Sequence, residues 1–298
     1  MKRLIIIFLA GLLLVLAACA PVPPASQGDG APETPIEVTE QPEQEPEAPV
    51  DSGDVISEEE VTPLSEAEKR QLPWDTDPEA LIISATFCCG FAPQLALTNY
   101  IPDAQVWGDG RVVWVEQSDD GSRRVLEGHI DLGELELLLN RIKDAGFFEW
   151  DEYYSNPQVA DFADKCINVN LLEGEKSVCE YYEGAPAAFH ELYALLSEGA
   201  GAPDGEDYAP ESGFLTVIPL GSDVPTESVD AMLNWDAPGL GISLSVVEDE
   251  GGAWVSGTTL EAAWQVVNQR PWNPLVQEGD SFYMLGLQVP NLSMVPPT

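Results

Sequence analysis

The sequence predicts an α+β fold in which two or three helices pack on an antiparallel sheet, and three observations support this. From about residue 81 onward, short apolar runs are divided by turn-forming residues, which is typical of strands. Other stretches carry apolar residues at intervals of three and four, which is typical of helices packed on a core. Because the order is strands, helix, strands, helix, the pattern favours an antiparallel sheet over a succession of parallel βα units.

The first strands are predicted from four apolar runs. Residues 81–87 and 94–101 each form such a run. Residues 111–116 and 123–130 are predicted to form a hairpin around Asp119-Asp120-Gly121, because turn residues separate two segments of high β propensity.

Two helices are predicted to pack on these strands. Asp131 is expected to cap a helix over residues 132–144, and Gly146 to end it. Four apolar residues of this segment recur at helical spacing: Leu135, Leu138, Leu139 and Ile142. Pro186 is expected to open a second helix that continues to residue 196.

A second sheet-forming stretch follows a connection rich in Gly, Ala, Pro and Asp. Strands are predicted over residues 240–247, 253–256 and 281–289, with a helix over 260–269. The order echoes that of residues 111–182, which raises the hypothesis of two similar halves, the first with an insertion around 147–165. Independent origin of a common arrangement is the alternative. The predicted domains are 78–198 and 211–298.

The first residues have the pattern of an export signal. Lys2 and Arg3 precede an almost unbroken apolar run over residues 4–16, shorter than the roughly 20 apolar residues that span a bilayer. The run ends in Leu16-Ala17-Ala18-Cys19, which resembles the lipobox of bacterial lipoproteins. The resemblance implies removal of residues 1–18 and a diacylglycerol on Cys19. This lipid would anchor the chain on the extracytoplasmic side of a bacterial cell membrane, and the sequence does not indicate whether the membrane is the inner or the outer one. An ordinary signal peptide with an accidental cysteine is the alternative.

Residues 19–64 are predicted to be a disordered tether. Residues 20–63 contain no lysine, arginine or aromatic residue, and proline and glutamate dominate. Such a segment is extended, and at about 3.1 Å per residue it reaches somewhat over 100 Å at most. An interaction tail is the other interpretation. Ser65-Glu66-Ala67-Glu68 then predicts a short capped helix that ends before Pro73.

The charge of the chain excludes some partners. It has 52 acidic and 12 basic residues, a formal net charge of −40. Nucleic-acid binding requires a basic footprint, so we expect no nucleic-acid partner. Docking on anionic lipid is disfavoured for the same reason, which leaves the lipid on Cys19 as the membrane contact. A protein or glycan of the cell envelope is the expected partner.

Four cysteines follow Cys19, and an even number in an oxidising compartment predicts two disulfides. Cys166 and Cys179 lie in a predicted hairpin that turns at Gly174-Glu175. This turn would place Cys179 opposite Asn170, about 13 Å from Cys166 at strand rise, which is too far for a bond. We therefore expect each hairpin cysteine to bond to Cys88 or Cys89, with the partners unassigned. A metal site built from these thiols is the alternative, although no second CxxC motif or histidine pair accompanies them.

Four short motifs carry a resemblance to a known family: Cys88 with Pro93, Gly108-Asp109-Gly110, Ala145-Gly146-Phe147-Phe148 and Gly184-Ala185-Pro186. Together they resemble a family of small uncharacterised bacterial exported domains, over about residues 80–198. The family usually has a second cysteine just before the proline, where this chain has Ala92, so its disulfide arrangement does not transfer directly. The resemblance implies no activity.

No residue pattern predicts catalysis, a metal site or a cofactor. His129 and His190 are the two histidines, and no G-x-S-x-G motif accompanies them, so both are interpreted as surface or packing residues. Residues 75–79 have a calcium-loop composition but lack the required glycine and glutamate, which favours a solvated linker. The aromatic cluster over 147–154 is interpreted as core, with a sugar- or peptide-binding face as the alternative.

The sequence therefore favours a lipid-anchored extracytoplasmic module that binds a partner rather than an enzyme. A solute-binding lipoprotein is a second hypothesis, although about 220 residues without alternating βα units match two-lobed receptors poorly. A hydrolase that uses carboxylates or His129 is a third, and it requires a pocket in which such groups converge.

Overall fold

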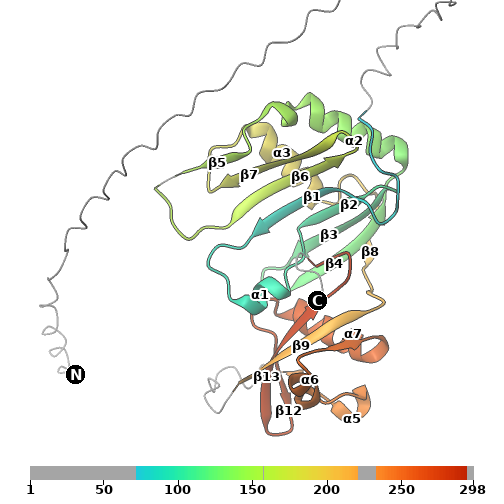
Figure 1. Cartoon of the computed structure of the whole chain (residues 1–298), viewed down its shortest axis with the longest axis vertical. Helices are drawn as coiled ribbons and strands as arrows, with labels where there is room; N and C mark the ends of the chain where they lie inside the picture. The colour runs from blue at the N-terminus through green and yellow to red at the C-terminus, as the bar shows by residue number, and fades with distance from the viewer. Residues whose placement is uncertain (1–71, 157, 221–232, 294–298) are drawn as a thin grey trace, which may run out of the picture. The chain divides into compact units, whose positions relative to one another are not determined.

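The computed structural model describes residues 72–156, 158–220 and 233–293. Every described residue belongs to one compact unit, which lies within residues 61–298. The predicted α+β fold is confirmed, with two sheets and their helices (Figure 1). Cys19, the predicted tether and the predicted helix at Ser65 lie outside the described residues. Among the described helices, none has the length and apolar character to cross a membrane.

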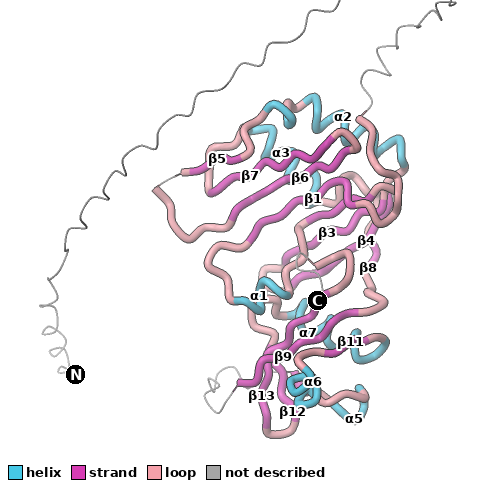
Figure 2. The backbone as a smooth tube through the Cα atoms, viewed as in Figure 1, coloured by secondary structure: helices cyan, strands magenta, loops and turns pink. Residues whose placement is uncertain are grey.

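Among the described residues the larger sheet has eight strands. They lie side by side in Figure 2. Neighbouring strands are antiparallel except β5 and β7, which are parallel. The order across the sheet is β5 (Tyr153–Ser155), β7 (Gly174–Tyr181), β6 (Asp164–Leu171), β1 (Leu81–Cys88), β2 (Ala104–Trp107), β3 (Arg111–Gln117), β4 (Arg123–His129) and β8 (Glu206–Asp207).

Helices α2 (Leu132–Asp144) and α3 (Ala187–Ser197) share a core with this sheet. Helix α2 has the predicted bounds, because Asp131 and Glu134 form a capping box that satisfies the first free N–H groups. The four apolar residues predicted to face the core are all buried. Gly146 follows in the left-handed conformation and leads into a 3-10 helix, η2 (Phe147–Glu149).

The smaller sheet has five described strands and three helices. The order is β10 (Leu233–Asn234), β12 (Leu275–Glu278), β13 (Ser281–Gln288), β9 (Gly213–Leu220) and β11 (Ala253–Val255), with only β10 and β12 parallel. The helices are α5 (Ala237–Leu240), α6 (Leu244–Glu250) and α7 (Gly257–Gln269).

Strand β3 links the two hydrophobic cores. Its residues Val112 and Trp114 belong to the core shared with α2 and α3. Val113 and Val115 point to the opposite face and pack in a second core with residues of α7 and β13. A strand buried on both faces carries a continuous apolar run, which is what the sequence shows here. The two sheets of the described unit are therefore packed through β3.

Two predicted strands are wrong. Residues 94–101 contain a short helix, α1 (Gln94–Thr98), which begins after Pro93. Residues 240–247 contain the end of α5 and the start of α6, and Leu244 and Val247 are buried three residues apart on the helix. A correspondence between the halves is consequently confined to one strand, one helix and one hairpin. Helices α1 and α6 are so short that the spacing of their apolar residues fits a strand as well as a helix.

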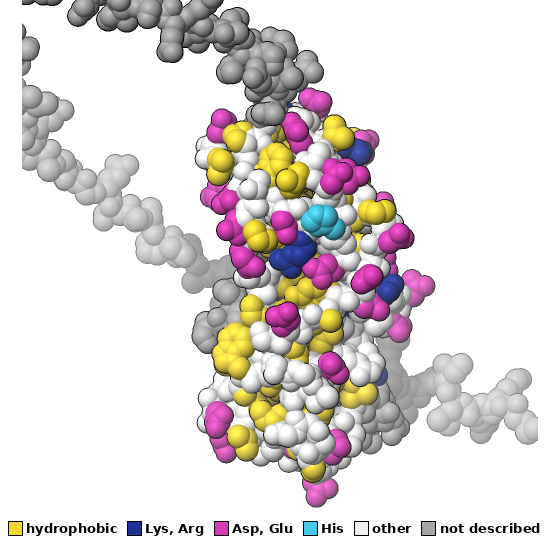
Figure 3. Space-filling view, turned by 90° about the vertical axis from the view of Figure 1, so that its right-hand side faces the viewer, with side chains coloured by type: hydrophobic (Ala, Val, Ile, Leu, Met, Phe, Trp, Pro, Cys, Tyr) yellow, Lys and Arg dark blue, Asp and Glu magenta, His cyan; other side chains and the backbone are white. Residues whose placement is uncertain are grey.

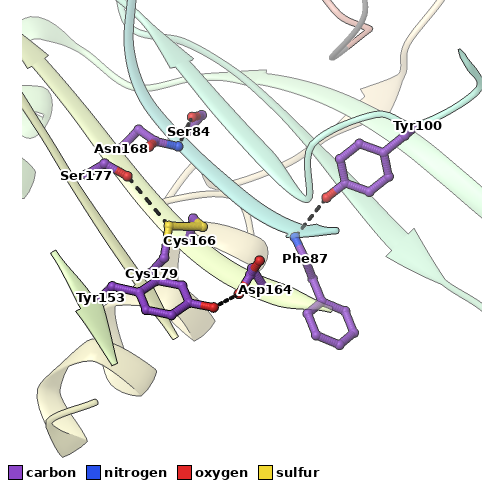
Figure 4. Close-up of a disulfide and its surroundings, with 9 residues drawn as sticks. All are labelled: Ser84, Phe87, Tyr100, Tyr153, Asp164, Cys166, Asn168, Ser177 and Cys179. Atoms are coloured by element: carbon purple, nitrogen blue, oxygen red, sulfur yellow. Dashed lines mark hydrogen bonds between the residues drawn. A yellow bond between two sulfur atoms is a disulfide. The ribbon is translucent and has the colours of Figure 1, made fainter. Parts of the chain in front are cut away.

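The predicted pairing of the hairpin cysteines with Cys88 or Cys89 is also wrong. Cys166 bonds to Cys179, with their Cα atoms 4.1 Å apart, and Cys88 bonds to Cys89. The hairpin turns at Leu172 and Glu173, so Leu171 pairs with Gly174. This register differs by four residues from the predicted one and places Cys166 directly opposite Cys179. Figure 4 shows the Cys166–Cys179 bond, with the Ser177 hydroxyl beside it.

Candidate functional site

A cavity of about 550 Å³ opens at one end of the larger sheet. Strands β1 and β3 end there, and their antiparallel neighbours β6 and β4 begin there. The strands, helix α1 and the connection from α1 to β2 contribute Phe87, Ala96, Tyr100, Ile101, Asp103, Val115, Gln117, Arg123 and Lys165. Antiparallel pairing therefore brings together side chains from four separate parts of the sequence.

Helix α3 and one loop complete this cavity, which we call the Asp103 pocket. The helix contributes His190, Tyr193, Ala194, Ser197 and Glu198, and the loop after α7 contributes Pro271 and Trp272. Four of the helix residues, at positions i, i+3, i+4 and i+7, share one face of α3: His190, Tyr193, Ala194 and Ser197. The volume of the pocket falls within the range of small-molecule sites, about 300–1,000 Å³.

Asp103 is a half-buried carboxylate that lines the pocket. The Tyr193 hydroxyl donates to the Asp103 carboxylate, and the Lys165 ammonium lies 4.9 Å from the centre of the Tyr193 ring. Burial raises the pKa of Asp103, while the hydrogen bond from Tyr193 and the charge of Lys165 act in the opposite direction. Burial and the Asp103 charge also raise the pKa of Tyr193, so its hydroxyl remains a donor at neutral pH.

Arg123 is the most deeply buried cation of the pocket. Arg123 is only 9% exposed, and its Nε donates a hydrogen bond to the side-chain oxygen Oδ1 of Asn268 at 2.6 Å. Burial lowers the pKa of Arg123 to about 10, which still leaves the guanidinium charged at neutral pH. The contact with Asn268 joins β4 to α7.

Aromatic side chains surround the mouth of the pocket. The Tyr100 hydroxyl accepts a hydrogen bond from the Phe87 N–H at 2.8 Å (Figure 4). The Phe87 ring is 42% exposed and lies 5.8 Å from the ring of Phe162. Trp272, 63% exposed, lines the pocket from the smaller sheet's side of the chain. These rings provide apolar surface next to the charged groups.

The histidines and the aromatic cluster lie largely where the sequence predicted. His129 is exposed at the end of β4 opposite Arg111, away from the pocket lining. His190 is at the pocket, and its Nε2 lies 3.4 Å from the buried Glu180 carboxylate. In the aromatic cluster Phe147 is fully buried, which confirms the interpretation as core, whereas Tyr153 is 54% exposed.

No metal site accompanies these groups within the described ranges. In residues 75–79 the carboxylates of Asp75 and Asp77 accept hydrogen bonds from the backbone N–H groups of Asp77 and Glu79. No cluster of three or more His, Cys, Asp or Glu side chains suited to a metal ion is present in the described part of the chain. Figure 3 shows acidic side chains scattered over one face of the molecule rather than gathered in one place.

A family model of domains of unknown function matches the part of the chain that forms this pocket. A DUF6438 domain of unknown function is found at residues 79–199. No curated protein and no solved structure matches the sequence. This match confirms the prediction that about residues 80–198 form a domain of unknown function. All residues lining the Asp103 pocket belong to the DUF6438 domain except Pro271 and Trp272.

The short motifs on which the sequence resemblance was based lie in elements around the pocket rather than in its lining. The Asp109 carboxylate accepts the Arg111 N–H at the start of β3. The buried Glu180 carboxylate accepts the Ala185 N–H at 2.9 Å, immediately before Pro186 begins α3. The motif at Gly184-Ala185-Pro186 thus fixes the helix that carries Tyr193. The pocket residues themselves have no local sequence signal, because they come from separate elements.

Proposed function

We propose that this protein is a lipid-anchored extracytoplasmic module whose DUF6438 domain binds an envelope ligand in the Asp103 pocket. The pocket carries the proposal, because it combines a volume of about 550 Å³ with buried polar groups and aromatic rings. This combination of a concave apolar site and a few convergent polar groups is typical of ligand sites. The lipobox-like sequence and the predicted tether support its location, at a distance from the membrane.

The geometry supports binding better than hydrolysis. His190 and Ser197 are seven residues apart on α3, which separates their Cα atoms by about 10 Å along the helix axis, too far for a serine–histidine pair. Asp103 accepts the Tyr193 hydroxyl, and Glu198 is exposed at the rim. A carboxylate-dependent hydrolase requires two carboxylates free to act on opposite sides of one bond. The antiparallel sheets likewise give a two-lobed solute receptor no support.

A pocket-filling substitution tests ligand binding. Ala194 lines the pocket from an exposed position of α3, so Ala194→Trp is expected to fill the cavity while preserving the fold. We expect the wild-type chain, purified from cells and denatured, to release a small molecule detectable by mass spectrometry, and Ala194→Trp to release at least tenfold less. Leu137→Trp, at an exposed position of α2 outside the pocket, is the matched control. Equal release from all three proteins would contradict the proposal.

Replacement of the predicted lipidation residue tests the anchor. Cys19→Ser removes the thiol to which the lipid would be attached, and we expect it to abolish incorporation of radiolabelled palmitate and to release the protein from the membrane fraction. The circular dichroism spectrum should be unchanged, because the described fold begins far from Cys19. Persistence of the label in Cys19→Ser would refute lipidation at this residue.

A further inference from the structure

Arg123 is a buried cation that lacks a carboxylate partner. Among the described residues, no carboxylate oxygen lies within 4.0 Å of its guanidinium, whereas the exposed Arg124 pairs with Asp207 at 2.5 Å. Its only hydrogen bond within the described part of the chain is from Nε to the neutral amide of Asn268. The chain has 52 acidic residues. In its described part none of them pairs with Arg123, whereas Asp207 pairs with Arg124.

The other charges of the pocket do not compensate Arg123. The positive charge of Lys165 favours the ionised form of the Asp103 carboxylate. This carboxylate also accepts a hydrogen bond from the Tyr193 hydroxyl. Burial makes the largest contribution to the lowered pKa of Arg123, and the neighbouring Tyr100 acts in the opposite direction. Glu198 is exposed, so solvent screens its charge. A buried cation without a counter-charge is unfavourable, and an anion that enters the pocket would relieve this cost.

Arg123 lines a cavity that suits an organic anion. Arg123 lines the pocket, and a guanidinium presents two parallel N–H donors that match the two oxygens of a carboxylate. Tyr100, Tyr193 and Trp272 add aromatic surface to the same lining. A small hydrated inorganic anion would leave this apolar surface uncovered, whereas a carboxylate on an apolar body would cover it.

We propose that the Asp103 pocket binds a small organic carboxylate with an aromatic or apolar body, and that its carboxylate pairs with Arg123. This inference rests on the proposed function and specifies the chemical class of its ligand. The carboxylate end would lie against the buried guanidinium, and the apolar body would extend toward the rings at the mouth. The charge of Lys165 would continue to favour the ionised form of the Asp103 carboxylate.

A set of matched probes tests this class. The full chain is titrated with 3-phenylpropanoate, 3-phenylpropanamide and 3-phenylpropylamine, which differ only in the charge of the polar end, and binding is followed by calorimetry. We expect the carboxylate to bind at least tenfold more tightly than the amide, because charge-assisted pairs are stronger than neutral hydrogen bonds. The amine should bind most weakly.

Two arginine variants connect this preference to the site. Arg123→Gln should reduce the preference for the carboxylate over the amide to about twofold or less. Arg124→Gln removes the same charge from the adjacent, exposed residue and should leave the preference unchanged. Asn268→Asp supplies an internal carboxylate to Arg123, and it should also abolish the preference, which keeps the test decisive if Arg123→Gln fails to fold.

The outcomes separate this inference from the proposed function. If the amide or the amine binds as tightly as the carboxylate, and Ala194→Trp blocks that binding, the pocket is a ligand site but the carboxylate assignment is wrong. If the preference survives in both Arg123→Gln and Asn268→Asp, Arg123 is not the recognition residue and the inference is refuted. If no probe binds and the wild-type chain releases no small molecule, the proposed function and the inference are both refuted.

Discussion

Replacement of Trp114 by alanine is expected to lower the free energy of unfolding by about 3–5 kcal/mol, the range for large aromatic residues removed from a core. Trp114 is 5% exposed on β3, among the residues packed against α3. Its ring is also covered by glycines of the connection from α3 to β9. An added Cβ at Gly199 would lie 3.1 Å from the ring, and one at Gly205 would overlap it.

The effect of Trp114→Ala should extend to that connection. Without the indole ring, the backbone at Gly199 and Gly205 loses the surface on which it packs, so the segment that leads into β8 should become less stable. Urea unfolding monitored by circular dichroism measures the loss of stability. Trp254→Ala, at a tryptophan that is 57% exposed, is the control and should cost about 1 kcal/mol or less. A loss below about 1 kcal/mol in Trp114→Ala would show that the ring is not a core residue.

Elements with strong local signals are predictable from the sequence. Helix α2 combines a capping box at Asp131 with a full apolar stripe, and its predicted bounds coincide with the observed ones. The continuous apolar run of β3 predicts a strand, although it does not indicate that the strand is buried between two layers. Local signals fail in short elements. Helix α1 has five residues, so its apolar positions fit a strand equally well.

The cysteine pairing shows how a small local difference changes a long-range prediction. Glycine favours turns, which points to Gly174, but the chain turns at Leu172 and Glu173 instead. Because hairpin register follows from the position of the turn, this choice moves Cys179 from opposite Asn170 to opposite Cys166. The presence of disulfides could be predicted from the composition, whereas their connectivity depended on a turn that the sequence leaves open.

The candidate site could not be predicted, because its residues are related only through the fold. Asp103 directly precedes β2 and Lys165 lies in β6, the two strands that flank β1, but four strands, α2 and η2 separate them in sequence. Arg123 follows a polar turn at the start of a strand, where an arginine is ordinarily exposed. It is buried because α7 packs across β4, with the Asn268 amide against its guanidinium. Its environment is therefore a property of the packing between the sheets.

That packing predicts a second large effect, at Asn99. The substitution Asn99→Ala should lower the free energy of unfolding by about 2–6 kcal/mol. Asn99 is 1% exposed, and its side chain bonds to two backbone groups of β13. Its Nδ2 donates to the Leu285 carbonyl at 3.0 Å, and its Oδ1 accepts the Leu287 N–H at 2.8 Å. Alanine would leave both buried backbone groups unsatisfied, at about 1–3 kcal/mol for each.

Hydrogen exchange distinguishes this cause from a general loss of packing. In Asn99→Ala the Leu287 amide should exchange faster than the overall loss of stability requires, because its acceptor is gone. The Leu285 amide, which donates to the Pro274 carbonyl, should change only with the overall stability. Asn273→Ala, at an exposed asparagine near β12, should alter stability by no more than about 0.5 kcal/mol. Equal acceleration at Leu285 and Leu287 would mean that Asn99 stabilises the sheets by packing alone, and that the two hydrogen bonds do not join them.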